Sequence, residues 1–255
     1  MNILERKENR LFLILGGFFI ANALLAEFIG IKIFSLENTL GLDTFNYKIF
    51  GEKVSFDLTA GVMLWPIVFV LTDIINEYFG IKGVRFLSFL TVGLISYAFL
   101  GVYFAINLSP SSWWIESAIS SGIPNFQKAF EKIFGQGLWI IAGSLTAFLI
   151  GQIVDVRVFQ KLKSITGENK IWLRATGSTL ISQLIDSFVV LFIAFKIGAD
   201  WSWSLFLAVG ISNYIFKFVI AVAMTPFIYL SHTIIDNFLG DDLALKMKKE
   251  ASNMG

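Results

Sequence analysis

Six long apolar stretches are the feature that most constrains how this chain can fold. A helix needs about 20 apolar residues to cross the hydrocarbon core of a bilayer. Only 15% of the chain is charged, whereas a soluble domain is roughly one quarter charged. We therefore predict an all-α integral membrane protein that forms a single domain over residues 1–255. Its six transmembrane helices, packed in one bundle, are expected at about 11–33, 58–78, 83–107, 136–160, 171–195 and 203–230.

The Lys and Arg residues between these stretches predict the orientation of the bundle. Positive side chains are retained on the cytoplasmic side of short loops. Thirteen of the 20 Lys and Arg residues flank one side, five flank the other, and Lys32 and Lys217 lie inside spans. The richer side includes residues near both ends of the chain, so both termini are predicted to be cytoplasmic.

Two segments on the other side, 34–57 and 108–135, are too long to be simple turns. Apolar residues recur over 126–134 with the spacing of one helical face. This pattern favours a short helix on the outer membrane surface, and a loop with chance spacing is the alternative. The role of the two segments stays open. The charged tail, 241–255, is expected to begin a short helix at Asp241.

Ionisable residues inside the spans are the first candidates for function. Each costs roughly 2.5–3.5 kcal/mol of insertion free energy at a helix centre, so it should face a protein interior or a wet cavity. The residues concerned are Glu27, Lys32, Asp73, Glu77, Asp155, Asp186 and Lys217. Lys32 lies near a span end, where its long side chain can reach water.

The second span has a face that combines aromatic rings with carboxylates. Residues four apart lie on the same side of a helix. Those on this face are Trp65, Phe69, Asp73 and Glu77, with Asn76 adjoining them. This arrangement predicts a binding face around Asp73. Glu77 lies closer to the cytoplasm, and an ion pair with Lys82 or Arg85 is the structural alternative for it.

Three further spans contribute polar candidates. The fourth and fifth each place an amide and a carboxylate three residues apart, and the sixth places an amide and an ammonium one turn apart. These residues are Gln152 with Asp155, Gln183 with Asp186, and Asn213 with Lys217. An ion pair of Asp155 with Arg157 or Arg174 is the structural alternative there. Lys217 needs a carboxylate partner, and we expect Asp73 or Asp186.

Other classes of protein lack the residues they require. The chain has no Cys and one His, so thiolate sites and His-rich zinc sites are not expected. Its net charge of +1 provides no electrostatic footprint for nucleic acid. It also has no P-loop and no Gly-x-Gly-Asp protease motif. We therefore expect no metal, no cofactor and no enzymatic activity.

Several of these motifs resemble those of the queuosine precursor transporters, a family classed with vitamin uptake transporters. The segment Thr72–Gly80, preceded by Pro66, is similar to the signature of that family. Gln152 to Asp186 resembles its central block, and Lys217 with Thr225 and Pro226 resembles its last-span motif. The resemblance covers roughly residues 20–230. The long 108–135 segment departs from the shorter family pattern.

The resemblance implies a multi-pass protein of the bacterial inner membrane that imports 7-cyano-7-deazaguanine or 7-aminomethyl-7-deazaguanine for queuosine salvage. The edge of a guanine-like base offers a ring N–H and an amine that one carboxylate can accept together, while aromatic faces stack on the ring. Five acids and two Lys within the spans leave three negative charges. This excess indicates protonated acids or coupling to a cation.

Two other classes stay open at this point. One is a substrate-binding membrane subunit that needs a separate ATPase module, for which small residues four apart in the first span would provide a docking face. The other is an intramembrane hydrolase that uses two aspartates. The preferred precursor, the coupling ion and the formation of a homo-oligomer do not follow from the sequence.

Overall fold

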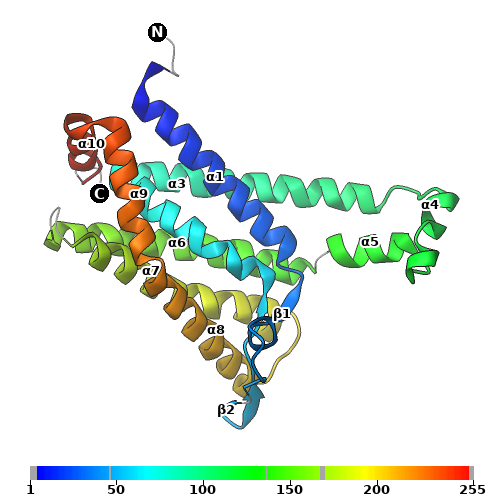
Figure 1. Ribbon diagram of the computed structural model, residues 1–255. Coiled ribbons are helices and arrows are strands. Elements are labelled where there is room, and N and C mark those ends of the chain that lie inside the picture. Colours follow the sequence, from blue (N-terminus) through cyan, green and yellow to red (C-terminus); the bar gives the residue numbers. More distant parts are fainter. Residues whose placement is uncertain (1–4, 46, 136, 167–169, 253–255) are drawn as a thin grey trace.

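The computed structural model describes residues 5–45, 47–135, 137–166 and 170–252 of the chain, shown in Figure 1. In this part, five helical segments are long and apolar enough to cross a bilayer. They are Lys7–Ile29, Trp65–Ile106, Phe126–Thr166, Ile171–Ile197 and Trp203–Ala223. The protein is therefore an all-α, multi-pass membrane protein, as the apolar stretches predict.

Helix α3, Trp65–Ile106, accounts for the difference between five segments and the six expected spans. At Gly80 the backbone adopts φ 66° and ψ −172°, a conformation that only glycine adopts without strain. Figure 1 shows that α3 consists of two arms joined by a sharp turn beside α10, and Gly80 is the non-helical residue between them. The expected spans at 58–78 and 83–107 lie on these arms.

The first of these expectations is wrong at its start. The helix begins at Trp65 rather than at residue 58, because residues 57–63 form a short strand and a 3-10 turn. Pro66 occupies the first turn of α3, where its missing N–H removes no helical hydrogen bond.

The sixth expected span also ends differently. Helix α8, Trp203–Ala223, is followed by α9, Thr225–Leu239, and Pro226 lies in the first turn of α9. Gly240, with φ 88°, then joins α9 to α10, Asp241–Ser252. The helix expected from Asp241 is thereby confirmed. Figure 1 places α10 beside the turn in α3, and a Cβ added to Gly80 would lie 3.0 Å from the Ala251 carbonyl oxygen.

Helices α6, Leu138–Thr166, and α7, Ile171–Leu191, form the most extensive helix pair in the described chain. Their close approach depends on small residues of α6. A Cβ added to Gly143 would lie 3.1 Å from the Val190 carbonyl oxygen, and one added to Gly151 would lie 3.6 Å from Cβ of Asp186. Small residues allow helix backbones to approach in this way. A π-helical turn, Phe192–Ile197, continues α7.

The 34–57 segment contains two antiparallel strand pairs that the sequence does not predict. In one, β1 pairs with β4, and Phe34 lies opposite Leu58; in the other, β2 pairs with β3, and Lys48 lies opposite Lys53. The strands are Ile33–Ser35, Tyr47–Ile49, Glu52–Val54 and Asp57–Thr59, with the short helices Leu36–Thr39 (α2) and Ala60–Met63 (η2) between and after them. Three-residue strands are too short to give a recognisable alternation.

The 108–135 segment contains the expected short helix, α5, Phe126–Phe134. The Asn125 side chain caps it by accepting a hydrogen bond of 2.9 Å from the Lys128 N–H. Before it come α4, Ser112–Glu116, and the 3-10 turn η3, Ile119–Ser121. In Figure 1, α4 and α5 lie beyond the C-terminal end of α3, which is the end away from α10.

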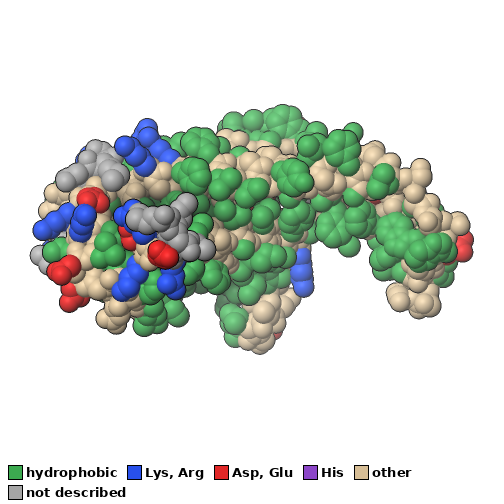
Figure 2. Space-filling view, turned by 90° about the horizontal axis from the view of Figure 1, so that it is seen from above, with side chains coloured by type: hydrophobic (Ala, Val, Ile, Leu, Met, Phe, Trp, Pro, Cys, Tyr) green, Lys and Arg blue, Asp and Glu red, His purple; other side chains and the backbone are tan. Residues whose placement is uncertain are grey.

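The surface of the molecule agrees with a bilayer environment. Figure 2 shows hydrophobic side chains along the length of the body, with most of the visible Lys and Arg side chains gathered at the end that carries α10. Large apolar side chains such as Phe18, Tyr97 and Leu138 are 62%, 74% and 82% exposed. Such a surface is suited to lipid on its sides and to water at its ends.

Candidate functional site

A small cavity of about 30 Å³ lies between α3, α7 and α8. It has room for about two water molecules, so binding of a larger ligand requires the surrounding helices to move apart. Five of the predicted binding residues line it, and they come from all three helices: Trp65, Phe69, Asp73, Gln183 and Lys217. The fold thus brings together candidates that are far apart in the sequence.

Asp73 is the acidic residue of α3 that lines this cavity, and its side chain is almost fully buried. Its two carboxyl oxygens accept hydrogen bonds from Ser178, at 3.4 Å, and from Thr179, at 3.3 Å. Both bonds are longer than is usual for hydroxyl donors. Asp73 forms no ion pair with any described residue, so its carboxyl group can receive further donors.

Gln183 contributes a hydrogen-bond donor that the described chain does not use. The residue is 4% exposed, and its Nε2 atom has no hydrogen-bond partner among the described residues. Leaving such a group without a partner costs about 1–3 kcal/mol. Because Gln183 lines the same cavity as Asp73, a ligand that offers an acceptor would remove this cost.

Lys217 forms an ion pair with Asp186, as the cost of an unpaired ammonium predicts. Its Nζ atom lies 2.5 Å from Oδ2 of Asp186. The sequence leaves Asp73 and Asp186 open as partners, and the structure selects Asp186. The pair joins α7 to α8 at the wall of the cavity.

Asp155 lies behind Asp73 on α6 and is fully buried. Its Oδ1 atom accepts a hydrogen bond of 3.0 Å from Ser182, which lies one turn along α7 from the Ser178 that donates to Asp73. Its Oδ2 atom has no hydrogen-bond partner among the described residues. The alternative in which Asp155 pairs with Arg157 or Arg174 is not the arrangement formed.

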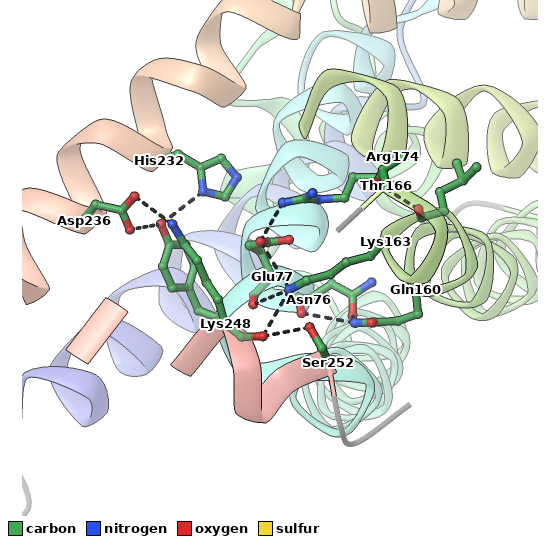
Figure 3. Close-up of polar contacts among 12 residues, drawn as sticks. Asn76, Glu77, Gln160, Lys163, Thr166, Arg174, His232, Asp236, Lys248 and Ser252 are labelled. Atoms are coloured by element: carbon green, nitrogen blue, oxygen red, sulfur yellow. Dashed lines mark hydrogen bonds and ion pairs between the residues drawn. The ribbon is translucent and has the colours of Figure 1, made fainter. Parts of the chain in front are cut away.

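Glu77 is instead the residue that pairs with Arg174, as Figure 3 shows. Its Oε1 atom lies 2.7 Å from Nη2 of Arg174 and 3.2 Å from Nζ of Lys163. All three side chains are essentially inaccessible to water. Glu77 therefore forms an ion pair, but the expected partners, Lys82 and Arg85, are wrong.

Three other predicted binding residues do not line this cavity. Asn76 accepts a hydrogen bond of 2.7 Å from Gln160, and Gln152 accepts one of 3.0 Å from Thr72. Gln152 lines a second, smaller cavity between the second arm of α3 and α6, and Asn213 lines neither cavity. Their roles as ligands stay predictions.

Hydroxyl groups of α7 are the part of the site that the sequence analysis misses. Thr176 and Thr179 line the cavity, while Ser178 and Ser182 contact the two aspartates. The available signal is the recurrence of Ser and Thr three or four residues apart in an otherwise apolar helix. Such a row marks a polar face inside the bundle.

A second polar network lies near the cytoplasmic end predicted by the charges (Figure 3). The Tyr78 hydroxyl lies 3.0 Å from Nδ1 of His232 and donates a hydrogen bond of 2.7 Å to Asp236. Lys248 of α10 forms an ion pair of 2.7 Å with Asp236. This network ties α3, α9 and α10 together and is separate from the cavity.

Comparison with known proteins identifies the family. Residues 59–231 match a family described as "Putative vitamin uptake transporter". The chain belongs to this family. Its members are transporters, which are not a class of enzymes, and the matched residues include every side chain that lines the cavity. No solved structure gives a significant match.

Three curated relatives extend this assignment. A probable queuosine precursor transporter of Bacillus subtilis is 33% identical over 198 residues, which cover 75% of this chain and 80% of the relative. The queuosine precursor transporter of Escherichia coli is 26% identical, with 74% and 79% covered. A probable queuosine precursor transporter of Haemophilus influenzae is also 26% identical, with 68% of each chain covered.

Proposed function

We propose that this protein imports 7-deazaguanine precursors of queuosine across the bacterial inner membrane. The names of its relatives support this function. The observation that carries it is the combination of two groups in one aromatic-lined cavity: the Asp73 carboxyl group, and the Gln183 Nε2 atom, which has no hydrogen-bond partner among the described residues. A subunit that depends on a separate ATPase module is not favoured, since the relatives are named as transporters themselves.

The chemistry of the cavity suits a guanine-like base. The two oxygens of Asp73 can accept the ring N–H and the exocyclic amine of such a base, and Gln183 can donate to its ring carbonyl. Trp65 and Phe69 offer aromatic faces for stacking. A base that satisfies both Asp73 and Gln183 is selected over one that lacks either edge group, because a mismatch leaves a buried polar group without a partner.

Uptake in cells tests this function. Cells that lack both queuosine precursor synthesis and their own transporter are expected to accumulate labelled 7-cyano-7-deazaguanine or its aminomethyl relative, and to regain queuosine in tRNA, when they express this chain. Cells with an empty vector provide the background. If neither precursor enters above that background while the protein is present in the membrane, the proposed substrate is wrong.

Asp73→Asn is expected to lower uptake by about 10- to 100-fold while the protein still inserts. The change replaces one acceptor oxygen with a donor and removes a charge-assisted hydrogen bond worth about 1.5–3 kcal/mol. Uptake rates at matched membrane abundance measure the effect. Asp242→Asn, on the exposed face of α10, is the matched control and should transport normally. Normal uptake by Asp73→Asn would exclude Asp73 as a ligand.

We also propose that the two arms of α3 each cross the membrane, which gives six crossings with both termini in the cytoplasm. The Lys and Arg residues gathered at one end support this orientation (Figure 2). Reporter fusions at residues 45 and 120 should then report the outside, and fusions at residue 165 and at the C-terminus the inside. A cytoplasmic signal from residue 120 would contradict six crossings.

A further inference from the structure

Asp73 and Asp155 form a pair of buried carboxyl groups on facing helices of the bundle. Asp73 is 1% exposed and Asp155 is not exposed at all. Ser178 and Ser182, one turn apart on α7, donate to Asp73 and Asp155 respectively. Helix α3 also contacts α6 on both sides of the pair, where Thr72 donates to Gln152 at 3.0 Å and Asn76 donates to the Val156 carbonyl oxygen at 3.4 Å. Two neighbouring carboxylates that are buried this deeply repel each other, and both stay ionised only when cations or several donors compensate them.

Cations do not compensate this pair in the described part of the chain. The charged groups of the surrounding helices have other partners: Lys217 of α8 binds Asp186 of α7, and Arg174 of α7 with Lys163 of α6 binds Glu77 of α3. Glu27 of α1 accepts a hydrogen bond from Ser144, and His232 of α9 bonds to Tyr78. Asp73 and Asp155 form no ion pair with a described residue.

Hydrogen bonds compensate the pair only in part. The donors to the two carboxyl groups are the hydroxyls of Ser178, Thr179 and Ser182. A hydroxyl has a single hydrogen to donate. Ser178 and Ser182 each also lie within hydrogen-bond distance of a helix carbonyl oxygen, that of Ala175 at 3.1 Å and that of Thr179 at 3.0 Å. Their hydrogens are therefore shared with the backbone.

We infer that Asp73 and Asp155 together bind one proton, and that this proton is the coupling ion of transport. The inference rests on the proposed function, because it assigns the substrate to Asp73. A base that donates two N–H groups to Asp73 needs that residue as a carboxylate. The proton is then held by Asp155, whose Oδ2 atom has no hydrogen-bond partner among the described residues, and the pair keeps one negative charge, on Asp73.

This arrangement makes substrate and proton bind cooperatively. Protonation of Asp155 removes the repulsion that would oppose a carboxylate at Asp73, so it favours binding of the base. By linkage, the bound base favours protonation of Asp155 to the same extent. A carrier that binds both together moves them in the same direction, so the inward proton gradient of a bacterial membrane would drive accumulation of the base.

Proteoliposomes containing the full chain test the coupling. With the membrane potential clamped at zero, an inside-alkaline gradient of about one pH unit should concentrate labelled 7-cyano-7-deazaguanine about tenfold for one proton per substrate. A protonophore should abolish this accumulation. Asp155→Asn should lower the ratio of inside to outside substrate concentration to about one, whatever its rate of uptake. Asp242→Asn should keep this ratio at about ten.

The outcomes separate this inference from the proposed function. Uptake that does not respond to the pH gradient, or that follows a sodium gradient instead, overturns proton coupling while leaving the substrate assignment intact. Absence of uptake counts against the proposed substrate.

Infrared spectroscopy then decides the proton site without any substrate. At neutral pH the wild-type protein should show one protonated carboxyl group more than the double variant Asp73→Asn/Asp155→Asn. Any signal from Glu27 is the same in both proteins and cancels in the difference. An identical carboxyl signal in the two proteins would mean that both aspartates are ionised, and the inference would be wrong.

Discussion

Glu77→Gln is expected to reduce the amount of folded protein strongly, although Glu77 does not line the cavity. Glu77 supplies one carboxylate to two cations, Arg174 and Lys163, in a site that water does not reach. Removing one member of a buried ion pair costs about 3–5 kcal/mol, because the charge that remains stays buried without a partner of opposite sign. That is a large part of the 5–15 kcal/mol by which proteins are typically stable.

Fluorescence-detected size exclusion of the detergent-solubilised protein measures this loss. Glu250→Gln is the matched control, because Glu250 pairs with Lys246 on the exposed face of α10, and exposed pairs contribute about 0–1 kcal/mol. Adding Arg174→Met to Glu77→Gln should restore part of the abundance. Lys163 would keep the carbonyl oxygens of Glu77 and Lys248 as acceptors. Full abundance of Glu77→Gln with lost uptake would instead make Glu77 a ligand.

The case of Glu77 illustrates what the sequence does and does not predict. A carboxylate inside a membrane carries a large insertion cost, so the sequence predicts that Glu77 pairs with a cation, and the structure contains such a pair. Neighbours in the sequence, Lys82 and Arg85, are the natural candidates, yet α3 turns at Gly80. The carboxylate thus faces α6 and α7, from which Lys163 and Arg174 reach it. Contacts over 86 and 97 residues depend on helix packing, which hydropathy does not encode.

The membrane segments themselves were predictable because the bilayer imposes a length on them. The helices α1, α6, α7 and α8 overlap the expected spans, since about 20 apolar residues suffice to identify a crossing. The helix ends were less predictable. Residues 57–63 are apolar enough to extend a span, but pairing of β4 with β1 holds them outside α3. Local apolarity cannot reveal a partner strand more than twenty residues away.

The candidate site was predictable in its acids and aromatic residues and not in its hydroxyls. A carboxylate inside a span carries a large cost, so Asp73 attracts attention from the sequence alone. Thr176 and Thr179 insert into a membrane at little cost and leave no comparable signal. Only the packing of α7 against α3 and α8 makes them part of the cavity.

Breaking the ion pair between Lys217 and Asp186 is the second change with a large expected effect. Lys217→Met leaves a carboxylate, and Asp186→Asn leaves an ammonium, where the pair now lies with side-chain exposures of only 15% and 18%. The partial access to water from the cavity reduces the cost toward the lower end of the range for buried pairs, about 3 kcal/mol. Each single variant should therefore show clearly lower abundance in the membrane.

The double variants identify which acid Lys217 neutralises. Lys217→Met with Asp186→Asn should recover about 1–3 kcal/mol of the loss, because no charge is then left without its partner. Lys217→Met with Asp73→Asn should recover much less, since the hydrogen-bond donors of Asp73 are Ser178 and Thr179 rather than Lys217. Abundance is expected to return without uptake, because Lys217 lines the cavity. Equal recovery in both double variants would mean that Lys217 compensates the two acids together, and the pair with Asp186 would not be the dominant interaction.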